Sequence, residues 1–217
     1  MEISQELTLL CARLKAHEAC LNLIGKHSYY ETAFRTGDLL ALWSRREDCL
    51  IAAPWGIYDG FEGVRRHYEL DGYGDRNKPE ELDQLKGHMV VHEVDTAMVE
   101  VDSEALTARV AWVSPGHETL PDGTCFWCWT KAEGDFIFED GEWRFWKVRY
   151  YPIFKTPYDT PWTKIHIDYT EIAAGKHADR PNPDPVWEYG QPYPLHQPEP
   201  PLPYDHYDGC KFAEVAK

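Results

Sequence analysis

The stretch that decides the fold begins Gly87-His88-Met89-Val90-Val91-His92, runs on to Val101, turns at Asp102-Ser103-Glu104 and returns from Ala105 to His117. Apolar residues alternate with polar ones on both sides of that turn, at Ala97, Val99 and Val101 and again at Leu106, Ala108, Val110 and Trp112. A period of two is typical of strands with one buried face. The stretch therefore predicts two long strands paired as an antiparallel hairpin.

Three histidines lie at the ends of this predicted hairpin. His88 and His92 are four residues apart, so on a single strand they face the same way. An antiparallel partner strand can bring His117 back beside them. The pattern predicts an acid–base cluster on a rigid sheet. Three imidazoles are also a set that can ligate a metal and leave one position open for water. No aspartate or glutamate at ligand spacing supports that alternative, so no metal is predicted.

The sequence before the hairpin indicates helices and a short strand. Residues 3–35 are predicted to be helical, with Gly25 as a kink. One apolar face of that helix is marked by residues three and four apart, namely Ile3, Leu7, Leu10, Leu14, His17 and Leu21. A short helix at 39–43, a strand at 49–53, an aromatic loop at 55–60 and a helix at 61–70 are expected next. A polar segment at 71–84 is predicted to be a loop able to act as a lid.

The sequence after the hairpin predicts two more strands, at 125–138 and 143–154, joined by the turn signal Asp140-Gly141. The order of elements predicts an α+β fold in which a curved antiparallel sheet wraps the long N-terminal helix, over a domain of residues 1–165. Residues 166–217 form a separate C-terminal extension, because nine of the 16 prolines fall between positions 177 and 209. This extended arm is predicted to pack along its own sheet or a neighbouring subunit through its large aromatics, Trp187, Tyr189, Tyr193, Tyr204 and Tyr207.

The amino-acid composition restricts the kinds of partner that the protein is expected to bind. The 217 residues carry 37 acidic and 22 basic side chains, for a net charge of −15. Phosphate binding needs a basic face, so nucleic acid is excluded as an expected partner, and anionic membrane surfaces are disfavoured. No apolar run reaches 18 residues, and the first residues lack the basic and apolar parts of a signal peptide. We therefore expect a cytoplasmic protein whose partner is a small molecule.

Among the six cysteines, only Cys125 and Cys128 have motif spacing. They lie in an aromatic run that is typical of a strand. Residues three apart on a strand face opposite ways, which opposes joint ligation of a metal. A structural role is predicted for both.

Four segments resemble, in their order and spacing, the SnoaL-like branch of the nuclear transport factor 2 superfamily over about residues 8–165. They are Tyr30 through Ala33-Phe34-x-x-Gly37-Asp38, Gly60-x-Glu62-Gly63-Val64, His92 ahead of Val99-Glu100-Val101-Asp102, and Asp140-Gly141-Glu142-Trp143-Arg144-Phe145. The resemblance implies a cone-shaped α+β barrel with one internal pocket, in a homodimer or homotrimer. The fold hosts dehydratases, isomerases, cyclases, dehydrohalogenases and non-catalytic binders, so it does not by itself name an activity.

The catalytic patterns that resemble this chain most are those of scytalone dehydratase and bile-acid 7α-dehydratase. The resemblance places Tyr30 at a catalytic tyrosine and His92 at a catalytic histidine. The family's helix aspartate falls at Arg35, and its second acidic position falls near Gly116 and His117. The Asp–His dyad of the family is therefore not carried over to this chain.

The resulting hypothesis is a cofactor-independent lyase, a dehydratase acting on a small hydrophobic hydroxylated aromatic or polycyclic compound. His92 is the expected general base, Tyr30 its acid partner and Arg149 the cation that holds an anionic oxygen, with His117 completing the catalytic set. The expected substrate-binding residues are His88, Tyr29, Trp55, Tyr58, Trp112, Trp127 and Lys147. The alternatives are an isomerase or cyclase of the same fold and a protein that binds a small ligand without chemistry.

Overall fold

The computed structural model describes residues 3–76, 78–164, 172–183, 189–192 and 197–212. The first half of the chain forms α1 (Ile3–Thr32), α2 (Thr36–Ala41), β1 (Leu50–Ala53), β2 (Gly56–Asp59) and α3 (Gly60–Arg66), followed by a π-helical turn (His67–Asp71) and a 3₁₀ helix (Pro79–Leu85). The second half forms β3 (Met89–His92), β4 (Asp95–Val101), β5 (Thr107–Thr119), β6 (Cys125–Glu139) and β7 (Glu142–Pro157).

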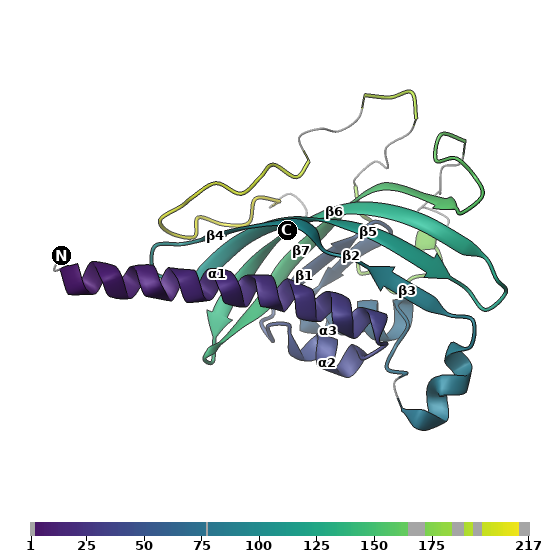
Figure 1. Cartoon of the computed structure of the whole chain (residues 1–217), viewed down its shortest axis with the longest axis horizontal. Coiled ribbons are helices and arrows are strands. Elements are labelled where there is room, and N and C mark those ends of the chain that lie inside the picture. The colour runs from purple at the N-terminus through teal and green to yellow at the C-terminus, as the bar shows by residue number, and fades with distance from the viewer. Residues whose placement is uncertain (1–2, 77, 165–171, 184–188, 193–196, 213–217) are drawn as a thin grey trace.

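One curved seven-stranded sheet carries the fold (Figure 1). Its strand order is β2-β1-β7-β6-β5-β3, and β4 pairs with β5 as well. The pairs that join β3 through β7 are antiparallel, and β1 joins β7 in parallel. The predicted α+β plan, a curved sheet around the N-terminal helix, is confirmed. The sheet is mixed rather than purely antiparallel and is not closed into a barrel, since β2 and β3 end its strand order.

The predicted first hairpin strand is divided in two. β3 pairs with β5 at Gly116–Thr119, whereas β4 pairs with β5 between Ala108 and Val113. The backbone breaks the ladder between them, with a positive φ of 48° at Thr96 and a register shift before Met98. Such irregularities let a sheet bend sharply. The break therefore leaves His92 as the last residue of β3.

Helix α1 buries a different face from the one that the sequence predicts. Its buried residues are Ala16, Cys20, Leu23, Ile24 and His27. The predicted apolar face is exposed, with relative accessibilities of 85% at Ile3, 59% at Leu7, 51% at Leu10 and 63% at Leu14. This apolar face does not enter the core, because the start of α1 extends past the sheet (Figure 1). The helix also continues through Gly25 without a break.

Three other local predictions have different outcomes. The Asp140-Gly141 turn is confirmed, because φ is positive at both residues, at 52° and 82°, as a tight two-residue hairpin requires. The aromatic loop expected at 55–60 instead contains β2, which forms a hairpin with β1. The polar segment at 71–84 is not all loop, since it runs into the 3₁₀ helix at Pro79–Leu85.

The last described stretch of the C-terminal arm, residues 204–212, packs on the sheet, on the side away from α1 (Figure 1). The strand register places Arg109, Asp135 and Lys147 side by side on β5, β6 and β7. The Tyr207 hydroxyl donates to Asp135 over 2.7 Å, and Asp208 pairs with the guanidinium of Arg109. Phe212 is buried against Leu50, Ala52 and Ile57. Trp187 and Tyr193 lie outside the described residues.

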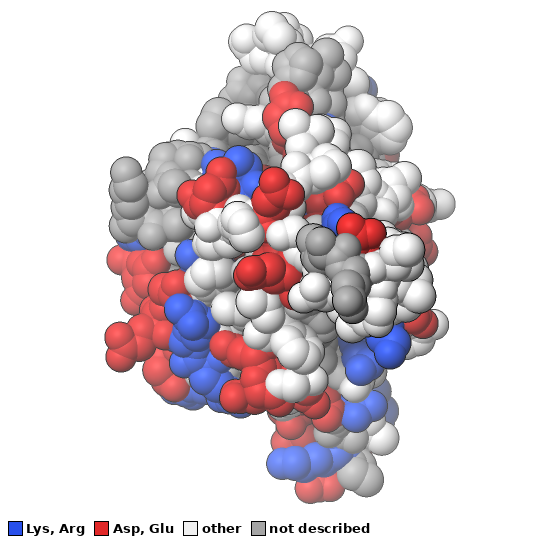
Figure 2. All heavy atoms as spheres, turned by 90° about the vertical axis from the view of Figure 1, so that its left-hand side faces the viewer, with Lys and Arg blue, Asp and Glu red and all other residues white. Residues whose placement is uncertain are grey.

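Charge on the surface is mixed. Figure 2 shows acidic and basic side chains interspersed on the face it presents, with no single basic patch. The absence of a basic patch on this face is consistent with the excess of acidic residues, which gives a net charge of −15. Within the described residues, no helix combines the length and the apolar character needed to cross a membrane.

Candidate active site

A cavity of about 350 Å³ lies against the concave face of the sheet, lined by α1, the π-helical turn and strands β3, β5, β6 and β7. Small-molecule sites have volumes of this order and combine an apolar wall with a few polar groups. The polar and ionisable side chains on its wall include His27, Ser28, Glu31, His67, Tyr68, Asp71, His92, Glu118, Cys128, Tyr150 and Lys155.

The strand register places part of this set in one row. His92 of β3 opposes Gly116 of β5, Gly116 opposes Cys128 of β6, and Cys128 opposes Lys155 of β7. Opposed residues of neighbouring strands share a face of the sheet, so this row projects into the cavity. Glu118 is two residues beyond Gly116 on β5 and therefore points to the same side.

Gly116 makes room for the row. A Cβ at this position would lie 2.5 Å from Sγ of Cys128 and 2.7 Å from Nδ1 of His92. Both distances are far inside van der Waals contact, and both side chains are held by their surroundings. The absence of a side chain at Gly116 therefore lets the imidazole and the thiol lie over β5.

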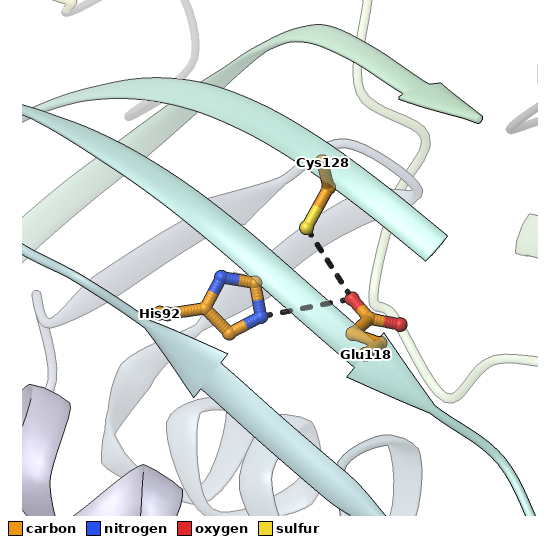
Figure 3. A group of neighbouring side chains, drawn as sticks. All are labelled: His92, Glu118 and Cys128. Carbon is orange, nitrogen blue, oxygen red and sulfur yellow. Dashed lines mark hydrogen bonds and ion pairs between the residues drawn. The ribbon is translucent and has the colours of Figure 1, made fainter. Parts of the chain in front are cut away.

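Glu118 contacts the side chains of His92 and Cys128 (Figure 3) and also that of Lys155. Its Oε1 lies 3.6 Å from Nε2 of His92 and accepts a hydrogen bond from Sγ of Cys128 over 3.7 Å. Its other oxygen pairs with the ammonium of Lys155. The hydroxyl of Ser28 on α1 donates to the backbone carbonyl of His92, which ties β3 to the helix.

The charges around Glu118 and His92 shift their pKa values in opposite directions. Burial alone would raise the pKa of Glu118, but the hydrogen bond with His92 and the ammonium of Lys155 outweigh burial and lower the pKa to about 2. Burial alone would lower the pKa of His92, but the carboxylates of Glu31 and Glu118 outweigh it and raise the pKa above 6.5. The result is a carboxylate that is ionised at neutral pH beside an imidazole of increased basicity.

The other two histidines that the described residues place on the cavity wall are kept neutral. Burial lowers the pKa of His27, and it lowers that of His67 to about 3. Nε2 of His27 lies 2.9 Å from the hydroxyl of Tyr68, which shares a hydrogen bond with Tyr150. His92 is thus the basic histidine of the cavity, and the two tyrosines supply neutral hydroxyls on its wall.

A second polar group lies at the end of the cavity formed by the π-helical turn. Asp71 accepts a hydrogen bond from the Tyr58 hydroxyl and lies 2.6 Å from Nδ1 of His177. The ring of Trp55 stacks on His67 at 5.6 Å between centroids. Nζ of Lys176 lies 5.2 Å from the Trp55 ring centroid. The segment around Lys176 and His177 therefore closes this end of the cavity.

Three of the residues predicted from sequence line the cavity, namely His92, Trp55 and Trp112. Tyr58 is adjacent to Trp55, since its hydroxyl accepts a hydrogen bond from Nε1 of Trp55 over 2.8 Å. The remaining predicted residues are not on the cavity wall. They are Tyr29, Tyr30, His88, His117, Trp127, Lys147 and Arg149.

Each of these residues has a different environment. Tyr29 is 80% exposed, and Tyr30 lies under the guanidinium of Arg35 at 4.8 Å. His88 stacks on Phe34 at 6.4 Å between ring centroids. The predicted pairing of His92 with Tyr30 across the cavity is therefore not found.

The sheet pleat explains the positions of the others. His117 opposes Val91, the neighbour of His92, so it points to the opposite face and contacts Trp127 at 4.6 Å. Lys147 and Arg149 alternate with the cavity residue Tyr150 and also point away. The predicted cluster of His88, His92 and His117 therefore does not form.

Sequence reasoning missed the two carboxylates that complete the site. Glu118 directly follows His117, and Glu31 precedes Arg35 by about one helical turn. Both are displaced slightly from the positions where the family pattern has its acids. The signal that finds Glu118 is the alternation of β5 combined with the pairing of His92 and Gly116, which needs the strand register.

His92, Glu118 and Cys128 also offer three metal-ligand atoms within 4.8 Å of one another. A cysteine must lose its proton to ligate a metal. Burial, followed by the charge of Glu118, raises the pKa of Cys128 to about 12, and the Lys155 ammonium already engages the carboxylate. In the structure the thiol donates to Glu118 and the ammonium of Lys155 pairs with the same carboxylate, and a metal ion would have to replace both contacts.

Comparison with known proteins supports the fold. No family model and no curated protein matches the sequence. A protein from Novosphingobium aromaticivorans that is provisionally named scytalone dehydratase matches with a TM-score of 0.55 and 17% identity, over 70% of this chain and 94% of that one. A type 2 hexachlorocyclohexane dehydrochlorinase (LinA) matches with a TM-score of 0.56 and 17% identity, over 73% and 96%.

A third solved structure matches to a similar extent, and its description names a fold family. A protein from Novosphingobium aromaticivorans described as NTF2-like, with a cystatin-like fold, matches with a TM-score of 0.52 and 18% identity, over 69% of this chain and 88% of that one. The matched proteins are thus covered almost completely, while part of this chain extends beyond them. The chain shares the fold of the nuclear transport factor 2-like proteins, as its resemblance to the SnoaL-like branch implies.

Proposed function

We propose that the protein is a lyase that needs no cofactor and eliminates a proton and a leaving group from a small, largely hydrophobic substrate. The observation that carries the proposal is the partly buried contact of His92 with the ionised Glu118 on the cavity wall. Fold neighbours provisionally named as dehydratases and a dehydrochlorinase agree with this class of reaction. Because these proteins share only 15% to 17% sequence identity with this chain, the proposed chemistry rests on the residues of the cavity.

In the proposed reaction, neutral His92 accepts a proton from a carbon next to the carbon that bears the leaving group. The electrons of the broken C–H bond form a C=C bond, and the leaving group departs with the electrons of its own bond. Glu118 stabilises the imidazolium as it forms, and the ammonium of Lys155 helps to keep Glu118 ionised at neutral pH. A positioned base of this kind typically contributes about 10²–10⁴-fold in rate.

The leaving group on this proposal is a hydroxyl on a saturated carbon of an aromatic or polycyclic compound, next to a carbon that carries the hydrogen taken by His92. It departs as water after taking a proton from Tyr68 or Tyr150, whose hydroxyls lie on the cavity wall and hydrogen-bond to each other. Burial raises the pKa of both tyrosines, so each hydroxyl keeps its proton at neutral pH. The aromatic rings of Trp55 and Trp112 on the wall suit a flat apolar substrate.

Two steps test the proposal. Thermal-shift screening with hydroxylated phenolic and polycyclic compounds identifies ligands, since binding to the native state raises the melting temperature. Each ligand is then incubated with the protein, and the dehydrated product is sought by mass spectrometry. We expect a loss of one water from at least one ligand, and His92→Ala is expected to keep binding while losing turnover.

The matched control is His117→Ala, which removes the same side chain from the other face of the sheet. Turnover in this control should stay near that of the wild type. Ligands that bind but are never converted would support the alternative of a binding protein. A product of the same mass as the ligand would support an isomerase or cyclase that uses the same base.

A further inference from the structure

The N-terminal half of α1 carries an exposed apolar stripe that belongs neither to the core nor to the cavity wall. Ile3, Leu7, Leu10 and Leu14 follow one another at steps of four, three and four residues, and each is more than half exposed. The face of α1 that packs against the sheet is a different one, formed by Ala16, Cys20, Leu23, Ile24 and His27. The helix therefore has two apolar faces, and its own chain covers one of them.

The spacing of the exposed stripe is that of a coiled coil. Alternating steps of four and three give a period of 3.5 residues, which keeps apolar side chains on the seam between two supercoiled helices. The pattern continues to Leu21, which is 37% exposed. Ile3 to Leu14 spans about 18 Å of helix, at about 1.5 Å per residue. A continuous apolar stripe of this kind on a soluble protein marks an interaction surface.

Charges beside the stripe complement one another. Glu6 and Arg13 are seven residues apart and both occupy the position just before a seam leucine, which is the g position of the heptad. Within the described part of the chain, neither forms an ion pair. The Arg13 guanidinium donates to the carbonyl of Val101 over 3.2 Å, and its Nε is buried without a hydrogen-bond partner.

We propose that this stripe pairs with the same stripe of a second copy of the chain, as an antiparallel two-helix coiled coil. Ile3 then packs against the partner's Leu14, and Leu7 against the partner's Leu10. Positions g face each other in antiparallel pairs, so Glu6 meets the partner's Arg13 twice in the dimer. In a parallel pair Glu6 would instead face the partner's Cys11, and this charge match would be lost.

The shape of the molecule fits the antiparallel arrangement. The start of α1 extends past the sheet, and Figure 2 views the molecule from that end. An overlap of residues 3–14 with the same residues of the partner leaves the two sheets at opposite ends of the coiled coil. A parallel overlap would place the two sheets beside each other at one end. The proposal is independent of the chemistry in the cavity.

The oligomeric state of the full chain tests the proposal. Multi-angle light scattering across a dilution series should give a dimer that dissociates on dilution. Leu10→Glu should shift the protein to monomer at concentrations where the wild type is dimeric. The matched control is Leu82→Glu, because Leu82 is equally exposed, at 54%, and lies on the 3₁₀ helix away from the stripe. A monomeric wild type, or a dimer that survives Leu10→Glu, would overturn the proposal.

The antiparallel orientation of the two helices can be tested separately. Ser4 and Cys11 both occupy e positions, which face each other only in the antiparallel pair. Under mild oxidation, Ser4→Cys should give a covalent dimer that the additional substitution Cys11→Ser abolishes. Circular dichroism confirms that each variant is folded. A covalent dimer that persists without Cys11, or none at all under conditions where light scattering shows a dimer, would contradict the antiparallel arrangement.

Discussion

Nε2 of His92 on β3 lies 3.6 Å from the carboxylate of Glu118 on β5, inside the cavity and beside a strand position that only glycine leaves open. The register of the two strands fixes this relationship, because Gly116 opposes His92 and Glu118 is the next residue of β5 on the same face. The imidazole and the carboxylate are held by regular sheet rather than by a loop. Groups held in this way need little reorganisation when charge develops.

The pH dependence of catalysis should report the raised pKa of His92. Only the neutral imidazole accepts a proton, so kcat/KM should rise with pH through this pKa, and the midpoint should lie above 6.5. Glu31→Gln or Glu118→Gln removes a carboxylate that raises the pKa, so each should move the midpoint to lower pH. A pH–rate profile of the three proteins checks this. Identical midpoints would remove His92 from the role of base.

Acid stability should report Glu118. Its folded pKa, about 2, lies below its usual value of 4.5, so its ionisation stabilises the fold above pH 4.5, and this contribution is lost as pH falls toward 2. The difference corresponds to about 3 kcal/mol at most. Glu118→Gln should therefore flatten the fall in unfolding free energy between pH 5 and 2, measured by urea titration at each pH. An equally steep fall in the variant would contradict the assigned pKa.

Gly116→Ala should displace the side chains that lie over β5 in the site. The added methyl group would lie 2.5 Å from Sγ of Cys128 and 2.7 Å from Nδ1 of His92, so one of the two must move. Overpacking of this kind costs about 1–3 kcal/mol, and the displaced imidazole should lower turnover as well. Gly25→Ala is the matched control, because that glycine is helical and has open space around it. Equal melting temperatures for the two variants would argue against a tight approach at Gly116.

The arm should contribute to stability through Tyr207. Its hydroxyl donates to Asp135, a carboxylate that is 2% exposed and whose pKa is raised by burial. Tyr207→Phe leaves this buried group with one donor fewer, which should cost about 1–3 kcal/mol. Tyr189→Phe provides the control, because Tyr189 is 61% exposed. Chemical denaturation measures both. No difference between them would mean that the arm does not stabilise the sheet through this hydrogen bond.

The sequence predicts the layers of this fold well because its strands follow period two and its hairpins have clear turn residues. Val99, Val101, Ala108, Val110 and Trp112 are buried as their alternation indicates, whereas Ala97 is half-buried and Leu106, beside the turn, is exposed. Helix α1 shows where the pattern fails. Two apolar stripes lie on it, and periodicity cannot tell which one meets the sheet and which one remains exposed.

The site is harder to predict because a slip of one residue on a strand moves a side chain to the other face. His117 and Glu118 are neighbours in the chain, yet only Glu118 points into the cavity, whereas His117 contacts Trp127. His92 could be identified from its likeness to the family, but its acidic partner required the register of β3 on β5. Arg149 is excluded from the cavity wall for the same reason, since it alternates with Tyr150.

The central claim is that His92 removes a proton from carbon. The most direct measurement compares turnover of a substrate found by screening with turnover of the same compound carrying deuterium at the reacting carbon, in the wild type, His92→Ala and His117→Ala. We expect a primary isotope effect in the wild type and in His117→Ala, and a rate lower by about 10²–10⁴-fold in His92→Ala. Full turnover in His92→Ala would show that His92 is not the base.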